Sequence, residues 1–157
     1  MIDLQIAETI SSIDIPALQE VGYLEQSAQA ALNYTGAPSN AGLTVVITDD
    51  EQLRQLNWQF LEIDAPTDVL SFPSGGGEPD PDSGDPYLGD ILISYPRALA
   101  QAETGGHPVK EELQLLLVHG VLHLMGYDHT EQDEKAKMWS AQSEILNSIG
   151  SSLRPPD

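Results

Sequence analysis

Apolar positions recur along the chain at two spacings, which predict an alternation of strands and helices. In the first segment every second residue is apolar, as in a strand that buries one face. Strands are predicted at residues 2–6, 43–48, 69–72 and 88–94. Helices are predicted from residue 16 to 32, from 50 to the turn before Pro66, from 96 to about 104, from 108 to 125 and from 130 to about 149. Thr130 with Asp133 resembles a capping start for the last of these helices. This order predicts a single α+β domain with a small mixed sheet and about five helices.

The helix over 108–125 is the most apolar part of the chain and is expected at the centre of the fold. Its apolar stretch, Leu113–Met125, is 13 residues long and contains His119 and His123. A membrane-spanning helix needs about 20 apolar residues, so no membrane partner is expected. The first residues lack the basic and apolar segments of a signal peptide, and the chain has no cysteine. Thiol chemistry and disulfides are excluded, and a cytoplasmic location is expected.

Residues 73–86 read PSGGGEPDPDSGDP, with four Gly, four Pro and four acids. This composition predicts a flexible surface loop rather than a linker between domains. A chain of 157 residues suits one domain, which is predicted over residues 1–150, with a frayed tail over 151–157.

The chain is strongly acidic, with 25 Asp and Glu against 6 Lys and Arg and a formal net charge of −19. Binding of phosphate groups rests largely on Lys and Arg. This charge therefore argues against a general basic surface for DNA or for an anionic membrane. Contact with nucleic acid would need a local site or a partner.

Three of the four histidines lie within eleven positions, in the segment HGVLHLMGYDH. His119 and His123 are four residues apart on the predicted helix, so both imidazoles project from one face. Gly126 allows the chain to leave the helix and turn back, which brings His129 toward the same point. Three neutral imidazoles that converge in this way can bind one divalent ion, zinc first of all, and leave a position open for water. An ion at such a site lowers the pKa of its bound water toward about 7 and makes it a nucleophile at neutral pH.

The spacing of the three histidines is that of the metzincin peptidases, with one decisive difference. Those enzymes carry a glutamate, their general base, directly after the first histidine, and here that position is Gly120. Glu111 and Glu112 lie one to two turns upstream and are poor replacements. Asp128 is the one side-chain candidate for assisting the bound water, although orienting a ligand or holding the turn is favoured for it.

The histidine segment resembles the signature of the YbeY family of bacterial metal-dependent endoribonucleases, which is close to H-G-x-L-H-L-x-G-Y-D-H. Residues 57–72 resemble a second family motif, N-x-x-[FY]-R…P-T-D-V-L-S-F-P. LGDILIS at 88–94 is a third match, and Met138 and Glu144 on the last helix are a weaker fourth. The matches span most of residues 45–150, whereas the first 40 residues agree only in their strand and helix character.

The resemblance implies a zincin-like domain with one catalytic metal ion, usually zinc, held by His119, His123 and His129. It implies single-strand-specific endoribonuclease activity in rRNA maturation, notably at the 3′ end of 16S rRNA, and in ribosome quality control. The implied partners are RNA and the small ribosomal subunit or a protein factor associated with it, and not DNA.

One position departs from the family pattern. Leu61 stands where the family has an arginine after the aromatic residue of the second motif. An arginine there is a natural contact for phosphate, so the substitution bears on catalytic strength. Arg54 lies seven residues earlier on roughly the same helix face and is the predicted substitute. Thr67 and Asp68 are the other predicted substrate-binding residues, with Ser71 beside them at the cleft.

Two alternatives to the endoribonuclease stay open at this point. One is a metallopeptidase-like hydrolase, and the other is a ribosome-associated module with a structural metal and weak or no catalysis. A structural zinc takes four protein ligands, and His107 is the only spare histidine. The six cations form no tract, so we expect weak and strongly salt-sensitive affinity for free RNA, with targeting supplied by a partner.

Overall fold

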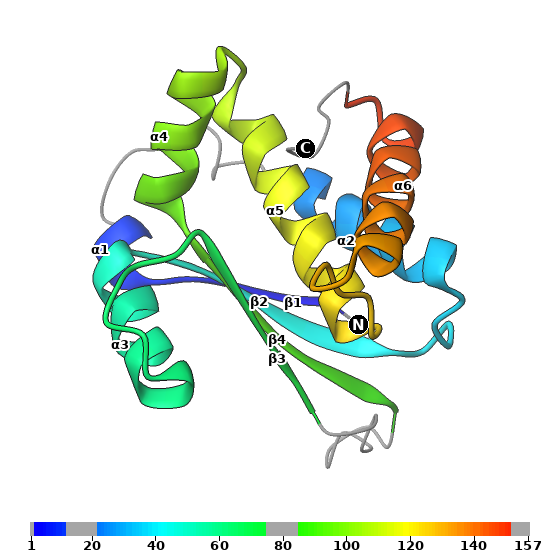
Figure 1. The fold of residues 1–157 in the computed structure, drawn as a ribbon, viewed down its shortest axis with the longest axis horizontal. Coiled ribbons are helices and arrows are strands. Elements are labelled where there is room, and N and C mark those ends of the chain that lie inside the picture. Colours follow the sequence, from blue (N-terminus) through cyan, green and yellow to red (C-terminus); the bar gives the residue numbers. More distant parts are fainter. Residues whose placement is uncertain (1, 12–21, 75–84, 152–157) are drawn as a thin grey trace.

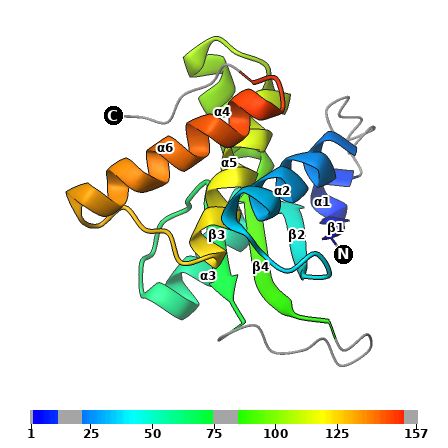
Figure 2. The same cartoon turned by 90° about the vertical axis from the view of Figure 1, so that its right-hand side faces the viewer.

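A four-stranded sheet carries helices on both faces (Figures 1 and 2). The structure, a computed structural model, describes residues 2–11, 22–74 and 85–151. The strands are β1 (Ile2–Ile6), β2 (Gly42–Thr48), β3 (Val69–Pro73) and β4 (Tyr87–Ser94). The helices of the described residues are α1 (Glu8–Ser11), α2 (Gly22–Thr35), α3 (Asp50–Leu61), α4 (Tyr95–Gly105), α5 (Val109–Leu124) and α6 (Gln132–Ser148).

The sheet is mixed, and its antiparallel strand lies at one edge. The strand order is β1-β2-β4-β3. β1, β2 and β4 run parallel, with Val45 opposite Ile91, whereas β3 is antiparallel to β4, with Val69 opposite Ile93. Helix α5 packs along β3 and β4, so the edge strand lies directly beside the helix that carries two of the histidines.

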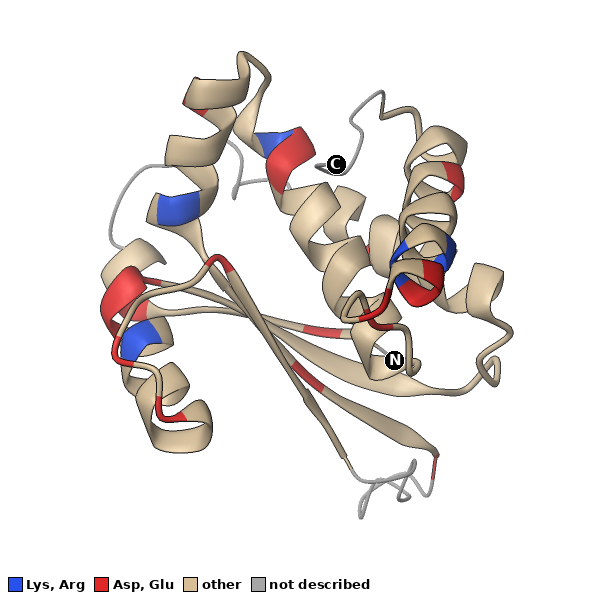
Figure 3. Ribbon diagram, in the orientation of Figure 1, with Lys and Arg blue, Asp and Glu red and all other residues tan. Residues whose placement is uncertain are grey.

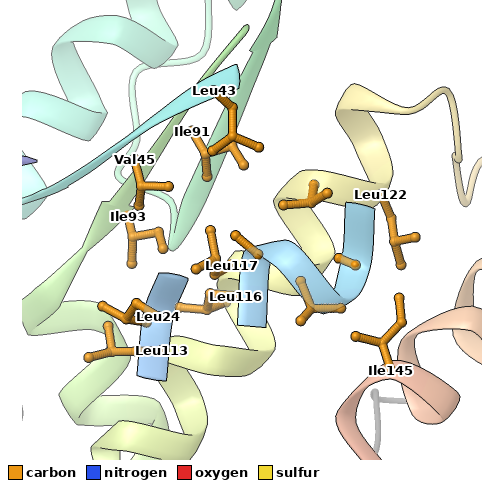
Figure 4. Close-up of a cluster of buried hydrophobic side chains, with 14 of the residues drawn as sticks. Leu24, Leu43, Val45, Ile91, Ile93, Leu113, Leu116, Leu117, Leu122 and Ile145 are labelled. Carbon is orange, nitrogen blue, oxygen red and sulfur yellow. The ribbon is translucent and has the colours of Figure 1, made fainter. Parts of the chain in front are cut away.

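Alternation along the strands gives the sheet two apolar faces. Ile91 and Ile93 face α5 and are fully buried with the neighbouring side chains of β2 (Figure 4). Leu92, between them, points to the other face and packs with Leu70 of β3 and Leu53 of α3. This period of two is what a central strand covered by helices on both sides requires.

Helix α5 is the centre of the molecule, as predicted. Leu113, Leu117 and Val121 have no exposed surface. The helix contacts α2, α4 and α6 as well as the sheet. Figure 2 shows α2, α5 and α6 gathered on one side of the sheet. A helix that is apolar on nearly all sides belongs in such a buried position. In the described part of the chain, no helix has the length and apolar character needed to cross a membrane.

Most predicted elements are confirmed within a few residues. Asp49 and Ser94 cap α3 and α4 by accepting backbone N–H groups, as their sequence positions indicate. The predicted helix from residue 16 is described only from Gly22, and the short α1 was not predicted. The predicted flexible loop over 73–86 and the predicted tail lie mostly outside the described residues, and Ser151 is buried.

The predicted start of the last helix is wrong. Helix α6 begins at Gln132, with Glu131 as its N-cap residue and no side-chain capping bond. The hydroxyl of Thr130 instead lies 3.4 Å from the carboxylates of Asp128 and Glu134. Thr130 therefore serves the loop between α5 and α6 rather than the helix end.

Candidate metal centre

Three histidine side chains meet at the C-terminal end of α5. His119 and His123 are one turn apart on α5, and His129 lies in the loop before α6. One ring nitrogen of each lies within 4.8 Å of those of the other two. The Nε2 atoms of His119 and His123 are 3.0 Å apart. The structure thus brings together the three side chains that the sequence spacing singled out.

The far nitrogens of the two helix histidines are fixed by hydrogen bonds. His123 Nδ1 donates to the carbonyl oxygen of Tyr127, and His119 Nδ1 donates to Oε1 of the buried Gln142, each at 3.0 Å. A neutral imidazole carries one proton, so both Nε2 atoms are left with bare lone pairs. Two such lone pairs face each other favourably only when both bind a cation. Fixing of the outer nitrogen in this way is typical of metal-ligating histidines.

Burial keeps these rings neutral. Burial, followed by the neighbouring His123, lowers the pKa of His119 to about 4. Burial, followed by the nearby His129, also lowers the pKa of His123. Neutral imidazole is the form that binds a metal, so these two rings need lose no proton to do so at neutral pH.

A tight reversal after α5 brings the third histidine back. Gly126 has a φ of +93°, in the region that favours glycine, and the N–H of Tyr127 donates to the carbonyl of Leu122 at 2.9 Å. The carboxylate of Asp128 accepts the backbone N–H of His129 at 2.7 Å, and this bond lowers the pKa of Asp128. Asp128 therefore fixes the backbone that carries the third imidazole.

The donor set fits one divalent ion with imidazole ligands. Two imidazoles on one tetrahedral zinc ion have nitrogens about 3.3 Å apart, close to the 3.0 Å between His119 and His123. Within the described ranges, no further His, Asp or Glu joins the group. The spare His107 contacts Glu112 instead, at 2.7 Å. Three protein ligands leave one position open, as in catalytic rather than structural zinc sites.

Asp68, one of the predicted substrate contacts, lines a cleft of about 370 Å³ together with His119. Thr67 Oγ1 lies 3.4 Å from Asp68 Oδ1 and so helps to position this carboxylate. Ser71 donates its hydroxyl to the carbonyl of Gly120 at 3.1 Å, which fastens β3 to α5. Of these three motif residues, Asp68 is the one that lines the cleft.

Arg54 is held by two carboxylates on α3 and the loop that follows. Its guanidinium lies 2.6 Å from Glu51 and 2.5 Å from Asp64. Leu61, at the position of the family arginine, ends α3 and is 56% exposed. Arg54 must therefore give up two ion pairs before it can contact a phosphate, and its predicted role as a substitute stays a prediction.

The structure leaves no room for the general base of a metzincin peptidase. A Cβ atom at Gly120 would lie 2.7 Å from Ile91 Cγ2 and 3.2 Å from Ser71 Oγ. This position therefore faces the sheet, and a glutamate side chain would collide with it. The metallopeptidase alternative is not favoured.

Helix α6 supplies neighbours of the histidines that were not singled out from the sequence. The Trp139 ring lies 5.9 Å from that of His119 and 5.5 Å from that of His129, between centroids. Lys135 Nζ lies 5.8 Å from the centre of the Trp139 ring. Lys135, Trp139 and Gln142 follow the i, i+4, i+7 spacing of one helix face, which was the available signal.

The family model for "Endoribonuclease YbeY" matches residues 5–150 of this chain. The chain belongs to the YbeY family. The matched range includes all three histidines and the Asp68 motif, and it begins near the end of β1, so it also covers most of the first 40 residues, where the sequence resemblance was weakest.

Individual YbeY proteins are similar over most of their length. The chain is 40% identical to the Endoribonuclease YbeY of Lachnoclostridium phytofermentans, over 80% of this chain and 86% of that protein. It is 39% identical to that of Bacillus velezensis, over 94% and 95%. A solution structure of TM1509 from Thermotoga maritima has the same fold, with a TM-score of 0.57 and 22% sequence identity. The similarity covers 99% of this chain and 98% of the TM1509 chain.

Replacing Gln142 with leucine is expected to weaken metal binding about 10–100-fold, because loss of an outer partner frees the ligand ring. The matched control is Gln114→Leu, since Gln114 is also buried but bonds to Ser27 away from the triad. Affinity is measured by competition with a chromogenic chelator. Equal affinities for the two variants would show that the bond to His119 does not position a ligand.

Proposed function

We propose that this chain is a metal-dependent endoribonuclease that acts in rRNA maturation. The observation that carries the proposal is the group of three converging histidines, on the scaffold of a family whose members bear the name endoribonuclease. The cleft that shares His119 with this group gives an RNA strand a place beside it.

The protein's own residues act here by binding and orienting. The chemistry that a divalent ion supplies when bound at such a site is Lewis-acid activation of water and of a phosphoryl oxygen. His119, His123 and His129 would hold the ion, and we propose zinc because three imidazoles with an open position suit it. Gln142 and the Tyr127 carbonyl keep the Nε2 atoms of the two helix rings directed at one point.

The distribution of charge argues for recruitment by a partner. The described Lys and Arg residues are spread over α3, α4, α5 and α6 instead of being gathered on one element (Figure 3). Lys135, over Trp139, brings one positive charge to the side of the triad. Few phosphate contacts give weak affinity for free RNA, so we propose that the small ribosomal subunit, or a protein associated with it, delivers the RNA in the cytoplasm.

The proposal is tested by cleavage of labelled single-stranded and duplex RNA by the wild-type protein and by His119→Ala, purified in parallel. The wild type is expected to cut the single strand internally and to spare the duplex, and the variant is expected to be inactive. Equal cleavage by both preparations would reveal a contaminating nuclease and remove the support for the proposal.

A further inference from the structure

The cleft beside His119 has the size and lining of a pocket for one flat ring. Its volume of about 370 Å³ is near the lower end of the range for small-molecule sites, about 300–1,000 Å³. Its apolar walls come from β3, α5 and α6, through Val69, Leu115, Leu116 and Trp139. Its polar lining is formed by Asp68, Gln101, His107, Glu112 and Gln142, next to His119.

Glu112 is a buried acceptor in this lining with one oxygen to spare. The residue is 4% exposed, and its Oε1 accepts a hydrogen bond from His107 Nε2 at 2.7 Å. The described residues offer no hydrogen bond to its Oε2. Burial raises the pKa of Glu112, and the hydrogen bond from His107 opposes that rise without cancelling it. In its ionised form the carboxylate accepts hydrogen bonds and does not donate them. Among the described residues, the buried side-chain atoms without a partner do not include Oε2, so this oxygen is accessible from the cleft, where the donor of a ligand can reach it.

Two amides and a second carboxylate complete the polar lining. Gln101 Nε2 donates to Asp68 Oδ2 at 3.2 Å and thereby orients it. Gln142 uses its carbonyl oxygen for His119, so its amide N–H groups are free to donate. The lining therefore offers carboxylate acceptors and an amide donor to the edge of a bound ring.

We propose that this cleft is a nucleobase pocket that holds a base flanking the scissile phosphate and prefers bases with an exocyclic amine over uracil. The amine of adenine, cytosine or guanine would donate to Glu112, and an acceptor beside it would receive an N–H of Gln142. Uracil presents one N–H between two carbonyl oxygens. The carboxylates of Asp68 and Glu112 would repel these two carbonyl oxygens. Because His119 forms part of the wall, the sugar and phosphate of the bound nucleotide lie beside the triad. The inference rests on the proposed function and names a specificity element of that site.

Cleavage of a single-stranded RNA library with random positions measures the preference. At one position flanking the cut, uracil is expected to be depleted about tenfold by the wild type. Glu112→Gln is expected to reduce this depletion to about twofold or less while keeping its metal. Glu111→Gln changes the same charge at the neighbouring position, outside the cleft lining, and is expected to keep the full preference. Absence of any base preference in the wild type, or full preference in Glu112→Gln, would overturn the pocket.

Binding of free nucleosides to the metal-loaded wild-type protein provides a readout without cleavage. Adenosine, cytidine and guanosine are expected to shift the indole NMR signal of Trp139, and uridine to need at least about tenfold more ligand. The exposed Trp58 serves as the internal control. Equal responses to uridine would overturn the proposal. Selective nucleoside binding without RNA cleavage would instead refute the proposed function and leave the pocket standing.

Discussion

The His123→Ala protein is expected to bind no stoichiometric metal ion after dialysis, whereas the wild type binds one per chain. His123 supplies one of the two Nε2 atoms that face each other at 3.0 Å, and its ring is already held for this role by Tyr127. Loss of a hydrogen-bond partner of a ligand weakens metal binding by about 10–100-fold. Loss of the ligand itself should weaken metal binding by more than that. Metal content is measured by elemental analysis of the folded protein.

The matched control for this prediction is His107→Ala, which removes an imidazole that contacts Glu112 and lies outside the triad. It is expected to keep one ion per chain. Loss of metal from His107→Ala but not from His123→Ala would place the ion elsewhere and refute the assignment of the triad.

The Gly89→Ala protein is expected to lose about 2–6 kcal/mol of unfolding free energy. Gly89 has a φ of +141°, and a Cβ atom there would lie 2.2 Å from the carbonyl oxygen of Phe72 and 3.0 Å from Pro73 Cα. Backbone strain contributes about 1–3 kcal/mol, and overpacking contributes a similar amount. Relief requires β3 to move away from β4, with which it pairs at this point. Urea denaturation followed by circular dichroism measures the loss.

Gly36→Ala separates the two contributions to this loss. Gly36 also has a positive φ, of +76°, but a Cβ atom there would meet nothing within 4 Å. We expect a loss of about 1 kcal/mol from conformation alone. If the two variants lose equal stability, close approach between β3 and β4 is not what requires glycine at 89.

The local patterns along the chain were enough to predict most of the fold. Strands such as 43–48 are β-branched and apolar, and helix caps such as Asp49 are specified within one turn, so neighbouring residues decide them. The triad was predictable for the same reason, because a helical spacing of four and a glycine after the helix place all three rings. Thr130 shows the limit, since its hydroxyl lies near Asp128 and Glu134 in the loop instead of capping α6.

The surroundings of the triad were not predictable because they depend on packing between helices. Gln142 reaches His119 across 23 positions, and Trp139 joins it only because α6 lies against α5. Arg54 shows the same limit, because its helix face follows from the spacing along the chain whereas one of its two ion-pair partners does not. Glu51 is visible as an i, i+3 partner, whereas Asp64 reaches it from the loop after α3.

The most direct measurement of the central claim is the rate of single-stranded RNA cleavage as zinc is titrated into chelator-treated protein. The three-histidine assignment predicts a rate that rises with zinc and levels off at one ion per chain, with His123→Ala remaining at background throughout. Full activity in the metal-free protein, or a wild-type response in His123→Ala, would contradict it.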